Sequence, residues 1–272
     1  IAGCYGDPFV RTPTLDRLAE QGAVFDGCYC DNPLCVPSRM SMLTGRHGHQ
    51  IGVWSNHDSL DSTMPTVAHG MAIAGYKTVL AGRMHFIGED QYHGFEQREV
   101  GDVTHSYPHM NRAEHRFRGF YSTEESIQNP GEGNSFDLVY DTTVAMSACR
   151  AIRDHEVSGD PRPLFLVASF YSPHDPYVMP AAQLAPYLET SDSPIDAEPE
   201  SPHAFTAHKR RAAAFDQVTS DARRRARAAY RAKTDFVDRL MGEVVTYWNE
   251  CGMGGDDDVK VYLSDHGEML GE

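Results

Sequence analysis

The chain has 272 residues, of which 40% are hydrophobic and 23% charged, a composition ordinary for a globular protein with a sizeable core. Its 24 basic and 39 acidic residues leave a formal charge of −15, which disfavours nucleic acid and anionic membranes as general partners, and no apolar run is long enough to cross a bilayer. An anionic substrate is also repelled at long range, so a site for one needs its own local positive charge.

The hydrophobic pattern predicts helices and strands that alternate along the chain. In order, the expected elements are a helix at 14–22, a strand at 23–29, helices at 37–45 and 65–75, strands at 78–80 and 163–170, a long helix at 226–250 and a strand at 258–263. The stretches 101–135 and 184–222 look irregular and are expected to pass over the site. This alternation predicts an α/β fold, a three-layer α/β/α sandwich around a mainly parallel mixed sheet, with its ligand site beyond the carboxyl ends of the strands.

A cysteine motif stands directly ahead of the helix predicted at 37–45. Residues 35–45 read CVPSRMSMLTG, so Cys35 lies where free N–H groups and the helix dipole favour an anion. Arg39 lies one helical turn further on, where its side chain can reach back toward residue 35. The pattern C-x-P-S-R followed by T-G resembles the signature of the type I sulfatases.

The resemblance implies a specific chemistry for Cys35. In the family, a maturation enzyme oxidises this cysteine to formylglycine, so a formylglycine-generating enzyme is an expected partner. The hydrated aldehyde offers one oxygen to attack sulfur and a second hydroxyl through which the covalent sulfate ester collapses. Two plainer interpretations stay open: a cysteine that is only a buried small hydrophobe, and a zinc site built from Cys28, Cys30, Cys35, His47 and His49.

Further segments extend the resemblance. Residues 90–96, DQYHGFE, are similar to the choline-sulfatase and phosphonate-monoester-hydrolase branch in particular, and residues 32–35, NPLC, favour choline sulfatase. The segment 82–86, GRMHF, looks like the family's glycine-lysine-x-histidine element and contributes Arg83 and His85. Arginine stands where the family usually has lysine, which keeps the charge but changes its geometry. Asn56 matches a position that helps to hold the sulfate group, although a turn asparagine is the plainer alternative.

The ends of two later strands supply the other candidate residues. His174 follows the strand at 163–170, where it is placed to protonate a leaving-group oxygen. Asp265 and His266 follow the last predicted strand, where the family uses an aspartate to bind a divalent cation, commonly calcium. His266 replaces an asparagine of arylsulfatases, which makes manganese or zinc plausible as well. The resemblance thus implies a metal held by Asp265, His266 and the modified Cys35.

The resemblance as a whole implies one catalytic domain of the alkaline phosphatase superfamily over 1–272, which hydrolyses a small sulfate ester. The implied catalytic residues are Cys35, Arg39, His85 and His174, and the implied substrate-binding residues are Asn56 and Arg83. A phosphonate or phosphate diester hydrolase with the same machinery is one alternative, and an inactive relative that serves as a non-catalytic module is another. The family's first strand and C-terminal portion have no counterpart in 1–272, so we expect an incomplete domain with weak metal binding and little activity.

Three remaining features bear on partners and location. Six cysteines without a regular spacing, and no Asn-x-Ser/Thr acceptor, argue against a disulfide scaffold and favour the cytoplasm. The basic cluster at 209–233 is interpreted as a solvated helix face rather than a nucleic-acid site. The pattern names neither the alcohol of the ester nor the oligomeric state, so a homo-oligomer stays open.

Overall fold

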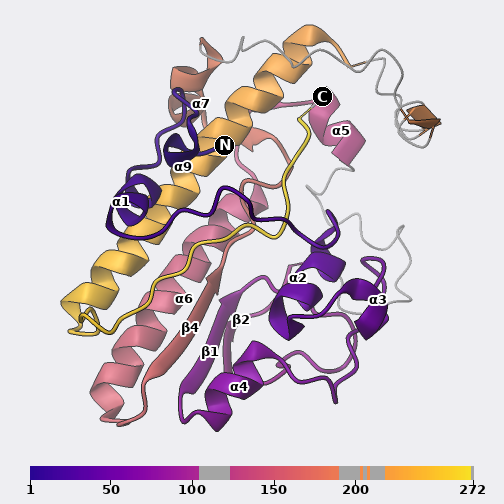
Figure 1. Ribbon diagram of the computed structural model, residues 1–272. Coiled ribbons are helices and arrows are strands. Elements are labelled where there is room, and N and C mark those ends of the chain that lie inside the picture. Colours follow the sequence, from indigo (N-terminus) through magenta and orange to yellow (C-terminus); the bar gives the residue numbers. More distant parts are fainter. Residues whose placement is uncertain (104–122, 190–202, 205–206, 209–217, 271–272) are drawn as a thin grey trace.

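The computed structural model of the protein describes residues 1–103, 123–189, 203–204, 207–208 and 218–270 (Figure 1). The N-terminal elements are η1 (Gly3–Tyr5), α1 (Pro13–Gln21), α2 (Cys35–Thr44), α3 (Gly48–Ile51), α4 (Val67–Ile73), β1 (Lys77–Gly82) and β2 (Gln97–Val100). They are followed by α5 (Thr123–Gln128), β3 (Gly131–Glu132), α6 (Phe136–Ser158), β4 (Leu164–Ser169), β5 (Val178–Met179), α7 (Ala181–Leu188) and α9 (Ser220–Glu250).

The main sheet has the order β2-β1-β4, and both strand pairs are parallel. Alternate side chains of these strands face opposite sides. Leu80 joins a core with Val36 and Met40 of α2, whereas Ala81 packs with Val144 of α6. Helices therefore cover both faces of the sheet, with α2 and α4 on one side and α6 on the other (Figure 1). The predicted α/β sandwich with a parallel sheet is confirmed.

A second apolar core lies outside the α6 layer. The long helix α9 packs against α6 and α7 through small side chains such as Ala226, Ala228 and Ala229, which are fully buried. Alanine lets two helices approach closely at little entropic cost, which suits a helix inserted between two others. No helix in the described ranges combines the length and the apolar character that crossing a membrane requires.

Two of the predicted strands are wrong. Residues 23–29 and 258–263 are not paired strands, and their side chains are widely exposed, with Phe25 at 72% and Val259 at 81%. A strand is stabilised by backbone hydrogen bonds to a neighbouring strand. A segment with an alternating apolar pattern but no such neighbour therefore forms no strand. The helices at 14–22, 37–45, 65–75 and 226–250 are confirmed with shifted ends; α9 begins at Ser220, and α2 begins at Cys35 itself.

The irregular stretches and the basic cluster are only partly described. Within 101–135 the structure has α5 and β3, and 184–222 contains the last residues of α7 and the first residues of α9. Residues 104–122 and 190–202 lie outside the described residues. In the basic cluster, 209–217 also lies outside them. The interpretation of the cluster as a solvated helix face is wrong for Arg227, Arg231 and Lys233, which are buried. Lys233 is 0% exposed because its ammonium group is satisfied inside the protein.

Candidate functional site

The N-terminus of α2 holds the central residue of the site. Cys35 is the first residue of this helix and is buried. The next backbone N–H, of Val36, donates to Oδ1 of Asn56 at 2.9 Å. Asn56 therefore supports the helix terminus beside Cys35, and its proposed contact with a sulfate group stays a prediction. The helix dipole and the remaining N–H groups at this end favour negative charge near the Cys35 side chain.

The turn after β1 brings two basic groups to the cysteine. Gly82 has φ +103° and sits so close to the carbonyl oxygen of Ser169 that a Cβ would collide with it, so only glycine fits. Arg83 then points inward, with Nη2 3.4 Å from Sγ of Cys35 and 3.3 Å from Nδ1 of His85. Its guanidinium lies over the ring of Tyr171 at 4.6 Å from the centroid. The charge of Arg83 is thus buried against an aromatic face and aimed at residue 35.

Arg39 makes different contacts from those its spacing predicts. It does not act chiefly on residue 35: its Nη1 donates to the carbonyl of Arg83 at 2.7 Å and to Oγ of Ser169 at 3.1 Å. Its Nε donates to Oδ2 of Asp265 at 2.8 Å, and both side chains are largely buried. A planar guanidinium with several donors can satisfy three acceptors from three directions. Arg39 therefore ties α2 to the ends of β1 and β4 and to the C-terminal segment.

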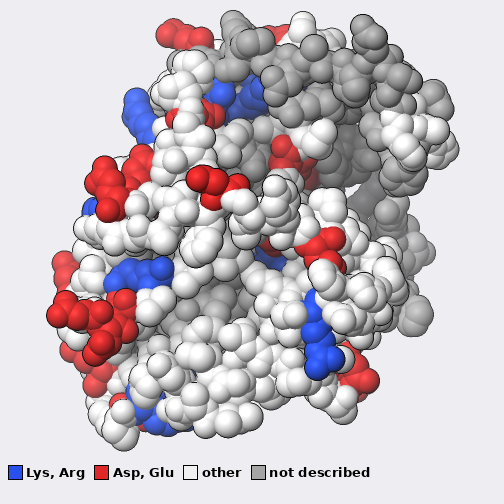
Figure 2. Space-filling view, in the orientation of Figure 1, with Lys and Arg blue, Asp and Glu red and all other residues white. Residues whose placement is uncertain are grey.

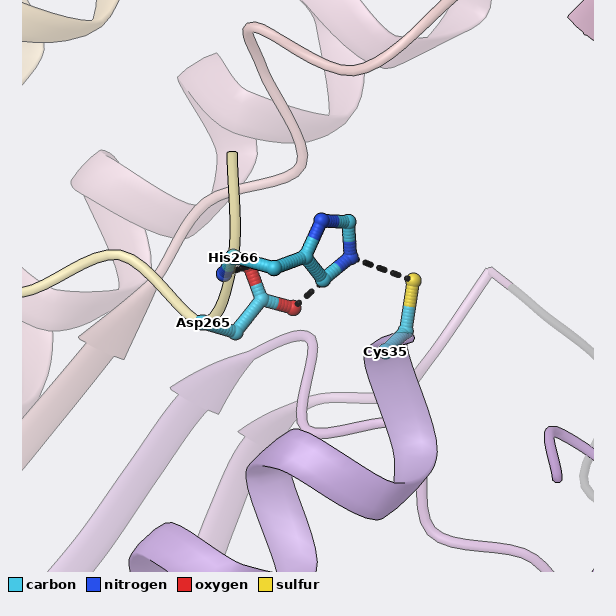
Figure 3. A group of neighbouring side chains, drawn as sticks. All are labelled: Cys35, Asp265 and His266. Carbon is cyan, nitrogen blue, oxygen red and sulfur yellow. Dashed lines mark hydrogen bonds and ion pairs between the residues drawn. The ribbon is translucent and has the colours of Figure 1, made fainter. Parts of the chain in front are cut away.

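Three histidines surround the sulfur. Nε2 of His266 lies 3.3 Å from Sγ of Cys35 (Figure 3). His85 and His174 also hydrogen-bond this side chain. Burial alone would raise the pKa of the Cys35 thiol, but these bonds and the Arg83 charge outweigh it and hold the pKa far below its usual range. The pocket is therefore built to stabilise negative charge at this position.

The same contacts shift the histidines in different directions. Burial alone would lower the pKa of His174, but its hydrogen bonds to Asp175 and Cys35 raise it to about 9. The bond to Cys35 raises the pKa of His266 to about 9 as well. Burial lowers the pKa of His85, against the effect of its bond to Cys35. One site therefore combines histidines that favour the charged form with one that favours the neutral form.

The possible metal ligands converge on the same point. Ligand atoms of Cys35, Asp265 and His266 all lie within 4.8 Å of one another, and in Figure 3 the three side chains point toward a common space. Among the described residues this is the one group of three or more such side chains, so the alternative zinc site with Cys28 and Cys30 is not assembled. Carboxylate and imidazole suit a divalent cation, and replacement of sulfur by oxygen at residue 35 would make the set suitable for harder ions.

The charge of the surface differs from that of the site. Figure 2 shows acidic side chains gathered at the edge of the molecule near the C-terminal end of α9, while basic atoms lie at the bottom of a hollow in the middle of this face. The buried Arg39 and Arg83 supply local positive charge in a protein whose formal charge is −15. This is the local cluster that an anionic substrate requires in an acidic protein.

Two residues that shape the site are missing from the candidates that the sequence offers. Asp102 accepts the backbone N–H groups of Met84, at 3.1 Å, and of His85. Ser38 donates its hydroxyl to the carbonyl of Asp265 at 2.5 Å. Ser38 belongs to the cysteine motif, so its position there could have drawn attention to it. For Asp102, 17 residues beyond His85, no local pattern exists.

Comparison with known proteins gives concordant findings. The family model described as Sulfatase matches residues 1–272. A choline-sulfatase of Rhizobium meliloti is 32% identical over 97% of this chain and 54% of its own length, and an uncharacterized sulfatase, YidJ, of Escherichia coli is 25% identical over 100% and 55%. A phosphonate monoester hydrolase from Silicibacter pomeroyi has the same fold, with a TM-score of 0.70 at 23% identity over 100% of this chain and 61% of that one. The chain spans about half the length of the curated relatives it matches.

Proposed function

The chain belongs to the sulfatase family, and from that membership we propose that it hydrolyses a small sulfate ester through a formylglycine formed from Cys35. The observation that carries the proposal is the convergence of cationic and histidine groups on the Cys35 side chain at the N-terminus of α2. Such preorganised donors stabilise the charge that develops on sulfuryl oxygens in the transition state.

Each candidate residue has a role that its contacts support. Arg83 binds the sulfate group, since its guanidinium faces residue 35 from a buried position. Arg39 holds Asp265 and adds positive charge to the site. His174, whose pKa is raised by its hydrogen bonds to Asp175 and Cys35 against the effect of burial, donates a proton to the oxygen of the leaving alcohol. His85, whose pKa is lowered, accepts a hydrogen bond at the nucleophile.

Sulfatases generally use formylglycine and a divalent metal, and the residues of this chain fit both. Asp265 and His266 would hold the ion beside residue 35, and the ion would supply positive charge that favours the ionised nucleophile. Calcium is our first choice, because Asp265 offers a carboxylate; His266 makes manganese or zinc the alternatives. A formylglycine-generating enzyme is the partner that this chemistry requires.

The first substrate to test is choline O-sulfate, because the relative that is 32% identical is a choline-sulfatase. An ester with a cationic alcohol also suits a protein of formal charge −15, which attracts that end of the molecule. The cysteines are free in the structure, which supports our proposal that the protein works in the cytoplasm.

Mass spectrometry tests the nucleophile directly. The tryptic peptide Leu18–Arg39 from protein made with a formylglycine-generating enzyme should carry an aldehyde at residue 35, with Cys28 and Cys30 unchanged. Cys35→Ala should then abolish sulfate release. An unmodified thiol under these conditions would favour a non-catalytic relative, and faster turnover of a phosphonate monoester than of any sulfate ester would favour the phosphonate hydrolase alternative.

A further inference from the structure

His174 has a buried carboxylate on the side of its ring that faces away from the sulfur. Its Nδ1 lies 2.8 Å from Oδ1 of Asp175 and 2.9 Å from the carbonyl oxygen of the same residue. Both neighbours are acceptors, so Nδ1 carries a proton whether the ring is charged or neutral. Since Asp175 occupies Nδ1, the nitrogen left for the hydrogen bond with Cys35 is Nε2.

Asp175 is itself held in place by buried contacts with two residues, Ser126 and Lys233. Oγ of Ser126 donates to its second carboxylate oxygen at 3.0 Å, and both residues are buried. The carbonyls on either side of it, of His174 and Pro176, accept from Nζ of Lys233 at 2.7 and 2.9 Å. Lys233 is fully buried and is paired with Asp137 at 2.5 Å. The loop cannot turn the carboxylate away from the ring without breaking several buried polar contacts.

We propose that Asp175 is a positioning residue that fixes the tautomer and the orientation of His174, so that the Nε2 proton faces the leaving group. The inference rests on the proposed sulfatase function. As an oxygen of the hydrated formylglycine at residue 35 bonds to sulfur, the S–O bond to the alcohol breaks, its electron pair passes to the alcohol oxygen, and the Nε2 proton of His174 moves to that oxygen. The Nδ1 proton stays between His174 and Asp175, which leaves a neutral imidazole in one defined tautomer.

The tautomer can be measured without any activity. Nitrogen-15 NMR of the imidazole groups in the unmodified chain should show His174 with Nδ1 protonated, and the signal is assigned by its absence in His174→Ala. In Asp175→Asn the carboxylate is lost, and only neutral oxygens, of the amide and of the backbone carbonyl of residue 175, face Nδ1, so above the pKa of the ring the fraction of the Nδ1-protonated tautomer should fall. An unchanged His174 signal in Asp175→Asn would overturn the proposal, even if the chain proves to be no sulfatase.

A series of leaving groups tests the consequence for catalysis. In the matured enzyme, Asp175→Asn should lower kcat by about 10²-fold for alkyl sulfates, the lower range of general acid catalysis, and by much less for nitrophenyl sulfate, whose anion leaves unaided. The matched control is Asp141→Asn, because Asp141 binds the same loop through the N–H groups of Tyr171 and Ser172 without touching the ring. The loss of kcat in Asp141→Asn should be uniform across the series of leaving groups. An equally uniform loss for Asp175→Asn would overturn the proposal.

Discussion

The candidate site has two sides that are built differently. On the sheet side, Arg83 and His85 follow β1 and His174 follows β4, two parallel strands in continuous register. On the C-terminal side, Asp265 and His266 lie in a segment that is outside the sheet in the part of the chain that the structure describes. The proposed anion-binding groups are thus placed by regular backbone, whereas the proposed metal ligands depend on side-chain contacts.

The sheet side is fixed by carboxylates that stand behind the site. Asp102 binds the backbone where it turns from β1 toward His85, and Asp141 accepts two consecutive N–H groups after β4 at 2.6 and 2.9 Å. A carboxylate that accepts two amide protons fixes a loop without entering the site itself. The proposed catalytic side chains are therefore positioned by carboxylates that lie behind the site.

The C-terminal side is fixed by the nucleophile helix. Ser38 and Arg39 of α2 hold the carbonyl and the carboxylate of Asp265, and His266 contacts Cys35. One helix thus carries Cys35, the proposed nucleophile, and also orients the proposed metal ligands. A change in α2 should therefore affect metal binding, whereas a change in the carboxylates behind the sheet should affect only the proposed anion-binding groups.

Arg39→Met should have the largest effect. It removes the cationic partner of a buried ion pair and leaves the Asp265 carboxylate without a countercharge. The free energy of unfolding should therefore fall by about 3–5 kcal/mol. Chemical denaturation measures the loss, and hydrogen exchange should show residues 258–269 opening faster than β1 and β4. Arg39→Lys, which keeps the charge, is the control. An equal increase of hydrogen exchange in the sheet and in the C-terminal segment would show that the two sides are not held separately.

Metal binding should stabilise the wild-type chain through the C-terminal side. At a free concentration 100 times its dissociation constant, Ca²⁺ or Mn²⁺ should raise the free energy of unfolding by about 2.7 kcal/mol, and a chelator should reverse this. Asp265→Asn should abolish the effect. Asp31→Asn is the matched control, since Asp31 binds His47 and the amide of Gly48 instead. Stabilisation that survives in Asp265→Asn would place the metal elsewhere.

Asp102→Ala should weaken the sheet side alone. The N–H groups of Met84 and His85 lose their acceptor, which costs about 1–3 kcal/mol of unfolding free energy when such groups are buried. Exchange of these two amides should accelerate while residues 258–269 keep their protection. Asp102→Asn retains one acceptor oxygen and should lie between wild type and Asp102→Ala. Loss of metal stabilisation in Asp102→Ala would show that the two sides are not independent.

The smallest effect is a pH dependence of stability. Burial alone would raise the pKa of Asp175, but its hydrogen bond with His174 lowers it below the ordinary value. A carboxylate with a lowered folded pKa stabilises the protein above its unfolded pKa, about 3.9, and loses that contribution as pH falls through the folded pKa. The stability difference between wild type and Asp175→Asn should therefore be about 1 kcal/mol near pH 6 and shrink below about pH 4. A difference that stays constant with pH would contradict the assignment.

Much of the sheet side could be predicted from the sequence. Arg83, His85 and His174 each follow an apolar strand, and carboxyl ends of neighbouring parallel strands meet at one edge of the sheet. The cysteine motif likewise predicts a helix terminus at Cys35, and α2 begins there. These inferences succeed because each depends on a local pattern and on a general rule for parallel sheets.

The supporting residues could not be predicted in the same way. In the sequence, Lys233 looks like one more member of the basic cluster at 209–233, and only the fold places Asp137 and two carbonyl groups against its ammonium. The exposed stretches 23–29 and 258–263 have the composition of strands without being paired. Sequence alone therefore determined the family and the elements that carry Cys35 and the basic groups. Tertiary structure decided which carboxylates hold them and which apolar stretches form strands, because hydrogen-bond partners distant in the chain belong to the fold and not to any local pattern.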